Sequence, residues 1–234
     1  MADTIEKIID LAKKSPVVKY WWEGRGKAPP AYIAGMAVAY VDAVAGLAAG
    51  DPYVAAMTAP VDPDGNRDIL SWYADLLDAA GLPRATAADR LLAVFVIMTG
   101  LGMRESSGQH CEGRDESAKA PATAATAEAG LFQVSYDSIG RHPLLAPLFE
   151  EHRNREDLLP IFSAGVTCPA KSWQDWGEGK GRDFQALMKR NPRLAILYTG
   201  ILMRCNRRHW GPLNTRKAEV NPDAAALFRD AAAL

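Results

Sequence analysis

Residues 86–108, TAADRLLAVFVIMTGLGMRESSG, decide the fold, because they predict a long helix that is buried on more than one side. Thr86 is a suitable N-cap residue, and Asp89 follows in the first turn, where a carboxylate favours helix formation. Apolar side chains in 91–101 occupy several helical faces. This pattern is typical of a helix inside a core rather than on a surface.

The end of this predicted helix carries a carboxyl group, that of Glu105. Gly100 and Gly102 are expected to loosen the last turn, and Ser106-Ser107-Gly108 is expected to end the helix. Glu105 then lies at the edge of the core, where the helix dipole and apolar neighbours both disfavour its ionisation. A carboxyl group that keeps its proton near neutral pH can protonate the oxygen of a glycosidic bond. An ordinary surface glutamate at a helix end is the alternative interpretation.

A second segment, Glu128-Ala129-Gly130-Leu131-Phe132-Gln133-Val134, follows further along the chain. Together with Glu105-Ser106-Ser107-Gly108 it resembles the goose-type lysozyme and lytic transglycosylase superfamily. In that superfamily a catalytic Glu stands in a Glu-Ser-x-Gly context at a helix end, and an Ala/Gly-x-Gly-Leu-Met/Phe-Gln-Val/Ile segment lines the sugar cleft. The resemblance covers residues 87–138. It implies a mainly α, lysozyme-like fold with little or no β structure, in which Glu105 is the general acid.

The resemblance also implies substrate-binding residues. Gln133 and nearby backbone groups would hold the sugar, with Phe132 beneath it. The superfamily commonly has an Ala-Tyr-Asn segment on a later helix, and this chain has no such triplet. Tyr198 or Asn206 near Trp210 could stand in for it. The candidate substrate-binding residues are Ser106, Gly130, Phe132, Gln133, Tyr136, Tyr198, Asn206, His209 and Trp210.

Hydrolysis of a glycosidic bond needs a second carboxylate that faces the general acid. Asp115, Glu116 and Glu128 are the acidic residues that surround the motif pair, and we expect Asp115 or Glu128 to be that partner. The alternative interpretation of each of them is an ordinary charged side chain in a solvated loop. An enzyme without such a partner could let the sugar's own 6-hydroxyl attack, as the lytic transglycosylases do.

The remaining signals are overwhelmingly helical. We expect a lysozyme-like catalytic domain over 81–234 and an N-terminal helical extension over 1–80 packed on it, with Leu131–Val134 as the one strand candidate. Lys19–Gly26 reads as a loop or docking strip. Its paired residues Trp21 and Trp22 could stack on a sugar face, although anchoring the extension to the core is the favoured use.

The segment Ala31–Ala49 is apolar except for Asp42, which raises the question of a membrane span. It is mostly Ala and Gly and carries that charge near its middle, so a buried, closely packed helix is favoured and no span is expected. The N-terminal residues 1–10 scatter charges among apolar positions and lack the apolar stretch of a signal peptide. We therefore expect a cytoplasmic location in the producing cell, or release by lysis or by a dedicated export route.

Composition and cysteine usage limit the kinds of partner, metal and cofactor that we expect. A formal net charge of -1 gives no electrostatic footprint for nucleic acid. Three cysteines, Cys111, Cys168 and Cys205, cannot all pair within the chain, and reduced thiols are the default. A metal site could be drawn from His110-Cys111 and the pair Cys205 and His209, but no second close pair completes a zinc pattern. We expect no metal and no cofactor.

The leading functional hypothesis is a glycan-cleaving enzyme that acts on β-1,4-linked amino-sugar polymers. A peptidoglycan muramidase with Glu105 as general acid is the expected form, and a chitin or chitosan hydrolase is the nearest alternative. The hypothesis from another class is a non-enzymatic lysozyme-fold module that binds a glycan or a protein partner. The sequence leaves the oligomeric state open.

Overall fold

Helix α6 (Ala87–Ser106) has the predicted beginning and end. The Thr86 hydroxyl accepts a hydrogen bond from the Asp89 backbone N–H at 3.1 Å, and the Asp89 carboxylate accepts one from the Thr86 N–H at 2.9 Å. This reciprocal pair satisfies two backbone donors at the helix start. Ser107 adopts a left-handed conformation, with φ of 54°, and ends the helix. The prediction from local sequence is confirmed here.

The two glycines near the end of α6 do not loosen it. The helix runs unbroken through Ser106, so that expectation was wrong. A Cβ atom at Gly100 would overlap the backbone of Glu219, and one at Gly102 would overlap the ring of Tyr32. The glycines are therefore required because other segments approach the helix closely, and such approaches between distant segments are not visible in local sequence.

The structure is a computed structural model that describes residues 2–114 and 123–234. It is mainly helical, as predicted. The α-helices are α1 (Ala2–Lys14), α2 (Pro30–Ala49), α3 (Pro52–Met57), α4 (Ile69–Trp72), α5 (Ala74–Ala79), α6, α7 (Leu145–His152), α8 (Leu159–Ser163), α9 (Lys180–Arg190), α10 (Pro192–Cys205), α11 (Gly211–Asn214) and α12 (Pro222–Ala232). The 3-10 helices are η1 (Pro16–Val18), η2 (Ala124–Thr126), η3 (Tyr136–Arg141), η4 (Ala170–Trp173) and η5 (Arg207–His209).

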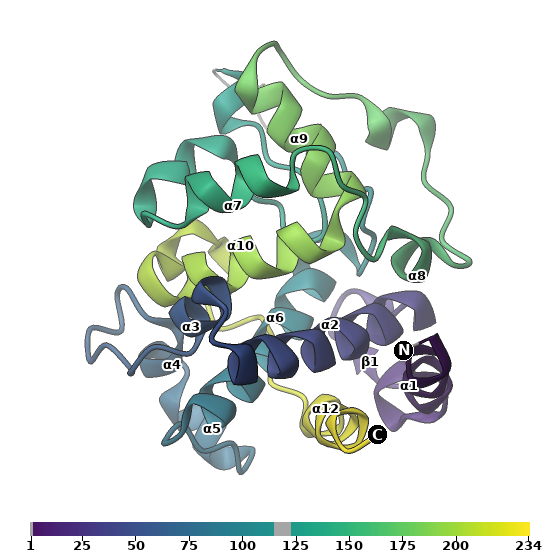
Figure 1. The fold of residues 1–234 in the computed structure, drawn as a ribbon, viewed down its shortest axis with the longest axis vertical. Coiled ribbons are helices and arrows are strands. Elements are labelled where there is room, and N and C mark those ends of the chain that lie inside the picture. Colours follow the sequence, from purple (N-terminus) through teal and green to yellow (C-terminus); the bar gives the residue numbers. More distant parts are fainter. Residues whose placement is uncertain (1, 115–122) are drawn as a thin grey trace.

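The helices pack around α2 and α6, which cross near the middle of the molecule (Figure 1). In that view α7, α9 and α10 lie above them, α3 to α5 lie at the lower left, and α1 and α12 bring the two chain ends together at the lower right. One hydrophobic cluster extends from Ile8 in α1 to Ala231 in α12. The N-terminal segment therefore shares its core with the rest of the chain, and the boundary near residue 80 stays a prediction.

Helix α2 has the length and composition of a candidate membrane span, with a mean hydropathy of 1.6. Within its most apolar window, 61% of the residues are buried inside the protein, and α1, α6, α8 and α12 all pack against it. A core helix gives the same sequence signal as a membrane span. The absence of a span stays a prediction that this packing favours.

The one β-sheet in the described residues is a hairpin of β1 (Trp21–Trp22) and β2 (Gly26–Lys27). It lies where a loop or docking strip was expected. The predicted strand Leu131–Val134 is instead a tight turn closed by an isolated bridge between Ala129 and Val134. That prediction was wrong because Gly130 and Gln133 adopt positive φ angles of 78° and 47°, which an extended strand does not allow.

Candidate functional site

Glu105 lies in the last turn of α6, at the edge of a cleft of about 350 Å³. Three separate segments form this cleft: the turn of the β1–β2 hairpin, the end of α6 with the loop after it, and the 128–134 turn. The residues that line it are Arg25, Glu105, Glu112, Gly113, Glu128 and Gln133. The structure thus brings together three residues singled out from the sequence, Glu105, Glu128 and Gln133.

The environment of Glu105 favours its protonated form. The pKa of Glu105 is raised from 4.5 to about 8: burial is the largest cause, the nearby charge of Glu128 also raises it, and the positive charge of Arg25 opposes them. Burial dominates because removing a carboxylate from water penalises the charged form. Glu105 therefore holds its proton at neutral pH while it faces a cleft, which is the property required of a general acid.

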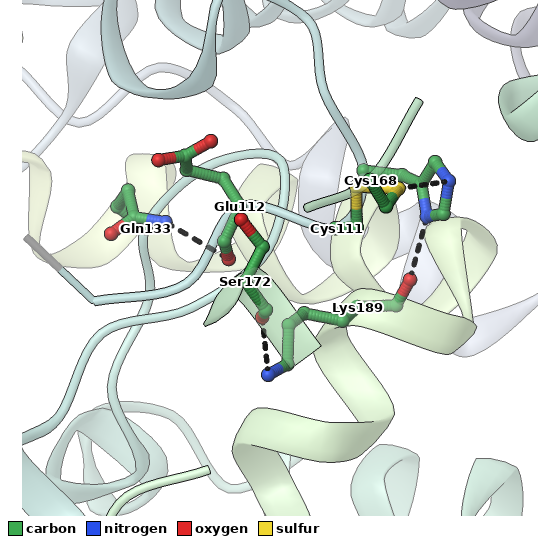
Figure 2. Close-up of a disulfide and its surroundings, with 7 residues drawn as sticks. Cys111, Glu112, Gln133, Cys168, Ser172 and Lys189 are labelled. Carbon is green, nitrogen blue, oxygen red and sulfur yellow. Dashed lines mark hydrogen bonds between the residues drawn. A yellow bond between two sulfur atoms is a disulfide. The ribbon is translucent and has the colours of Figure 1, made fainter. Parts of the chain in front are cut away.

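The 128–134 turn owes its shape to two residues with positive φ. A Cβ atom at Gly130 would lie 2.7 Å from the Met188 carbonyl oxygen, so no larger residue fits there without movement. The Gln133 side-chain amide donates to the Gly130 carbonyl at 3.1 Å. It also donates, more weakly, to the Glu112 carbonyl at 3.5 Å (Figure 2). The Gly130 N–H also donates to the Glu112 carbonyl, at 2.9 Å. The turn is thereby fixed to the cleft segment that carries Glu112.

Two further hydrogen bonds hold this turn from behind. The Ser106 hydroxyl, next to Glu105, donates to the Leu131 carbonyl at 2.8 Å. The Trp210 indole N–H donates to the Phe132 carbonyl at 2.7 Å. Both side chains are buried and neither lines the cleft. Ser106 and Trp210 therefore position the cleft wall rather than touch what enters it.

A disulfide joins Cys111 to Cys168, beside the cleft residue Glu112 (Figure 2). The expectation of reduced thiols was wrong for this pair, because the fold brings together two cysteines that are 57 residues apart in sequence. Cys205 is a free thiol. The disulfide connects the loop after α6 to the segment before η4 and so restrains one wall of the cleft.

The same region holds His110, whose ligand atoms lie within 4.8 Å of those of Cys111 and Cys168. Such a set could hold a metal only with free thiolates, and the disulfide uses both sulfur atoms. His110 Nδ1 instead donates to the Lys189 carbonyl at 2.9 Å, and the buried Lys189 ammonium pairs with Asp175 at 2.7 Å. These contacts fasten the disulfide region to α9.

Phe132, Tyr136 and Tyr198, all predicted to bind substrate, do not line the cleft. Phe132 is 1% exposed, so the structure places its ring in the core and not under a sugar. The half-buried Tyr136 packs edge-on against Phe149 and Phe184. The buried Tyr198 hydroxyl lies 2.8 Å from that of Ser138. In this structure all three aromatic residues stabilise the helical core.

Asn206 and His209 also lie outside the cleft lining. Asn206 is the C-cap residue of α10, and its N–H donates to the Leu202 carbonyl at 2.7 Å. The His209 ring packs at right angles to Trp210, with 4.8 Å between ring centres, and burial lowers its pKa. Asp115, the other predicted partner carboxylate, and Glu116 lie outside the described residues.

Three cleft residues, Arg25, Glu112 and Gly113, were not among the sequence candidates. Arg25 belongs to the strip around Trp21-Trp22, far from the motifs in sequence, and no local pattern connects it to Glu105. Glu112 stands directly after Cys111, so knowledge of the disulfide would have indicated a restrained acidic segment near the motif pair.

No known protein family, curated protein or solved structure matches this chain.

Proposed function

We propose that this protein is a glycan-cleaving enzyme that acts on β-1,4-linked amino-sugar polymers, with peptidoglycan as the expected substrate. The observation that carries the proposal is Glu105, a carboxyl group that faces a cleft and has a pKa raised to about 8. Its position at the end of α6, beside the 128–134 turn, is the arrangement that the resemblance to the lysozyme-like superfamily implies. That superfamily membership is itself part of the proposal.

In the proposed reaction, Glu105 donates its proton to the glycosidic oxygen as the bond to the anomeric carbon breaks. Positive charge then develops on the sugar ring. A second carboxylate deprotonates a water molecule that adds to the anomeric carbon, which gives a reducing end. Glu128 is an exposed carboxylate that lines the same cleft, and its charge acts on Glu105. We assign it as the partner carboxylate, together with or in place of Asp115.

The Cys111–Cys168 disulfide supports a site of action outside the reducing cytoplasm. Disulfides persist in oxidising compartments and at cell surfaces, where peptidoglycan lies, and are rare in the cytosol. This is consistent with a protein that is made in the cytoplasm and reaches the wall by lysis or by a dedicated export route. The proposal therefore places synthesis and action in different compartments.

The experiment compares the wild-type protein with Glu105→Gln. Turbidity loss of purified cell walls and reducing-end release from chitosan are measured at several pH values. A matched control is Glu6→Gln, since Glu6 is exposed on α1 and does not line the cleft. We expect wild-type and Glu6→Gln proteins to cleave and Glu105→Gln to be inactive. Binding without any release by the wild-type protein would instead favour a non-enzymatic module.

A further inference from the structure

The β1–β2 hairpin has one buried and one exposed face. Trp22 is 1% exposed and anchors the hairpin in the core, whereas Trp21 is 68% exposed. Trp21 pairs with Lys27 and Trp22 with Gly26 across the two strands. The turn between them is closed by a hydrogen bond from the Arg25 N–H to the Trp22 carbonyl at 3.0 Å. Arg25 is therefore held on a short, anchored turn.

This turn is fixed to the helix that carries Glu105. Arg104, the residue before Glu105, pairs with the Glu23 carboxylate at 3.7 Å and also donates to the Glu23 carbonyl. On the other side, the Glu219 carboxylate accepts hydrogen bonds from the Tyr20 hydroxyl at 2.6 Å and from the Glu23 N–H at 2.9 Å. These contacts determine where Arg25 lies relative to Glu105.

Arg25 is exposed and lines the cleft with Glu105, and its charge acts on that carboxyl group. Glu105 is protonated at neutral pH and so does not neutralise it. Within residues 2–114 and 123–234, the Arg25 guanidinium makes no hydrogen bond or ion pair. Glu112 and Glu128, the other charged groups of the cleft, each take part in an interaction. Arg25 is thus the cationic group of the cleft that remains available to a ligand.

We propose that Arg25 binds a carboxylate carried by the glycan substrate and makes the enzyme selective for anionic over neutral amino-sugar polymers. A guanidinium presents two parallel N–H groups that match the two oxygens of a carboxylate. In peptidoglycan that carboxylate can belong to the stem peptide or, on peptide-free strands, to the lactyl group. Chitin has no carboxylate, and chitosan carries amines that a guanidinium repels. This inference rests on the proposed function and defines its substrate class.

The test measures kcat/KM for wild-type, Arg25→Gln and Arg25→Lys proteins on three substrates: intact peptidoglycan, peptide-free wall glycan and neutral chitin oligosaccharides. Lys27→Gln is the matched control, because it removes the same charge from the same hairpin at a residue outside the cleft lining. For Arg25→Gln we expect the ratio of kcat/KM on anionic to neutral substrate to fall by about tenfold or more, mainly through KM. For Arg25→Lys this ratio should lie between those of the wild-type protein and Arg25→Gln, since an ammonium keeps the charge but lacks the paired N–H donors.

The two anionic substrates identify the source of the carboxylate. A loss confined to intact peptidoglycan assigns it to the stem peptide, and a loss on both assigns it to the glycan strand. An equal loss on anionic and neutral substrates, or no loss on any, would overturn the inference while leaving the proposed function intact. If the wild-type protein cleaves none of the three, the proposed function itself fails. Thermal unfolding of each variant checks that the exposed substitution leaves the fold unchanged.

Discussion

Glu105→Gln should stabilise the folded protein while it lowers the rate of cleavage by orders of magnitude. In the unfolded chain Glu105 ionises near its ordinary pKa of 4.5, whereas in the folded protein it keeps its proton up to about pH 8. The contribution of the protonated side chain is therefore fully present below pH 4.5 and is lost progressively as the pH rises to about 8. Glutamine does not ionise, so the variant avoids this loss.

The size of the effect follows from the pKa change. For a fully buried group, raising the pKa from 4.5 to about 8 costs about 5 kcal/mol of folding free energy above pH 8. Glu105 is half-buried and borders a cleft, where solvent screens its charge. We therefore expect Glu105→Gln to raise the free energy of unfolding by about 1–3 kcal/mol at pH 8 and by almost nothing at pH 4.

Urea unfolding of both proteins at half-unit steps from pH 4 to pH 9 measures this difference. The activity of the wild-type protein should fall as the pH rises above about 8, because Glu105, the proposed general acid, loses its proton there. The variant should lose about 100- to 10,000-fold in kcat. A stability difference that does not change with pH would refute the burial of Glu105. A folded variant with wild-type kcat would refute its role as acid.

Three further predictions concern neighbouring parts of the site. Glu128→Gln should move the pH-dependent loss of stability caused by Glu105 to lower pH, because the Glu128 charge raises the pKa of Glu105, and an unmoved stability profile in urea unfolding would contradict that coupling. Phe132→Ala should cost about 3–5 kcal/mol of stability, since Phe132 is 1% exposed, and an unchanged melting temperature with weakened substrate use would show a sugar platform instead. Cys168→Ser should lower stability by about 2–4 kcal/mol under oxidising conditions and reduce cleavage. If a reductant does not change the melting temperature of the wild-type protein, no disulfide forms.

Local signals in the sequence predicted helix α6 and the position of Glu105 at its end. Three features define this helix: the Thr86 and Asp89 capping pair, the apolar run and the Ser107-Gly108 end. Each depends on residues that are close together in the chain, so the beginning and end of the helix can be predicted from the sequence. The half-buried position of Glu105 followed from them. The predicted mainly α fold is confirmed for the same reason, since helix periodicity is a local property.

The parts that failed depend on contacts between distant segments. Gly100 is required by the close approach of the Glu219 backbone, and the Cys111–Cys168 pair forms because the fold joins two loops. Arg25 reaches the cleft through a hairpin that is held by Glu219, almost two hundred residues away in sequence. Neither spacing nor composition indicates these approaches. They arise only when the whole core packs.

The central claim is that Glu105 drives glycan cleavage in this cleft. Product analysis tests this claim most directly. Purified peptidoglycan is digested with wild-type protein and with Glu105→Gln, and the soluble fragments are weighed by mass spectrometry. We predict disaccharide-peptide fragments with hydrolysed reducing ends from the wild-type protein and none from the variant. Fragments one water lighter would show transglycosylation in place of hydrolysis and would leave the role of Glu105 standing. Equal fragment yields from both proteins, or no fragments from either, would contradict the claim.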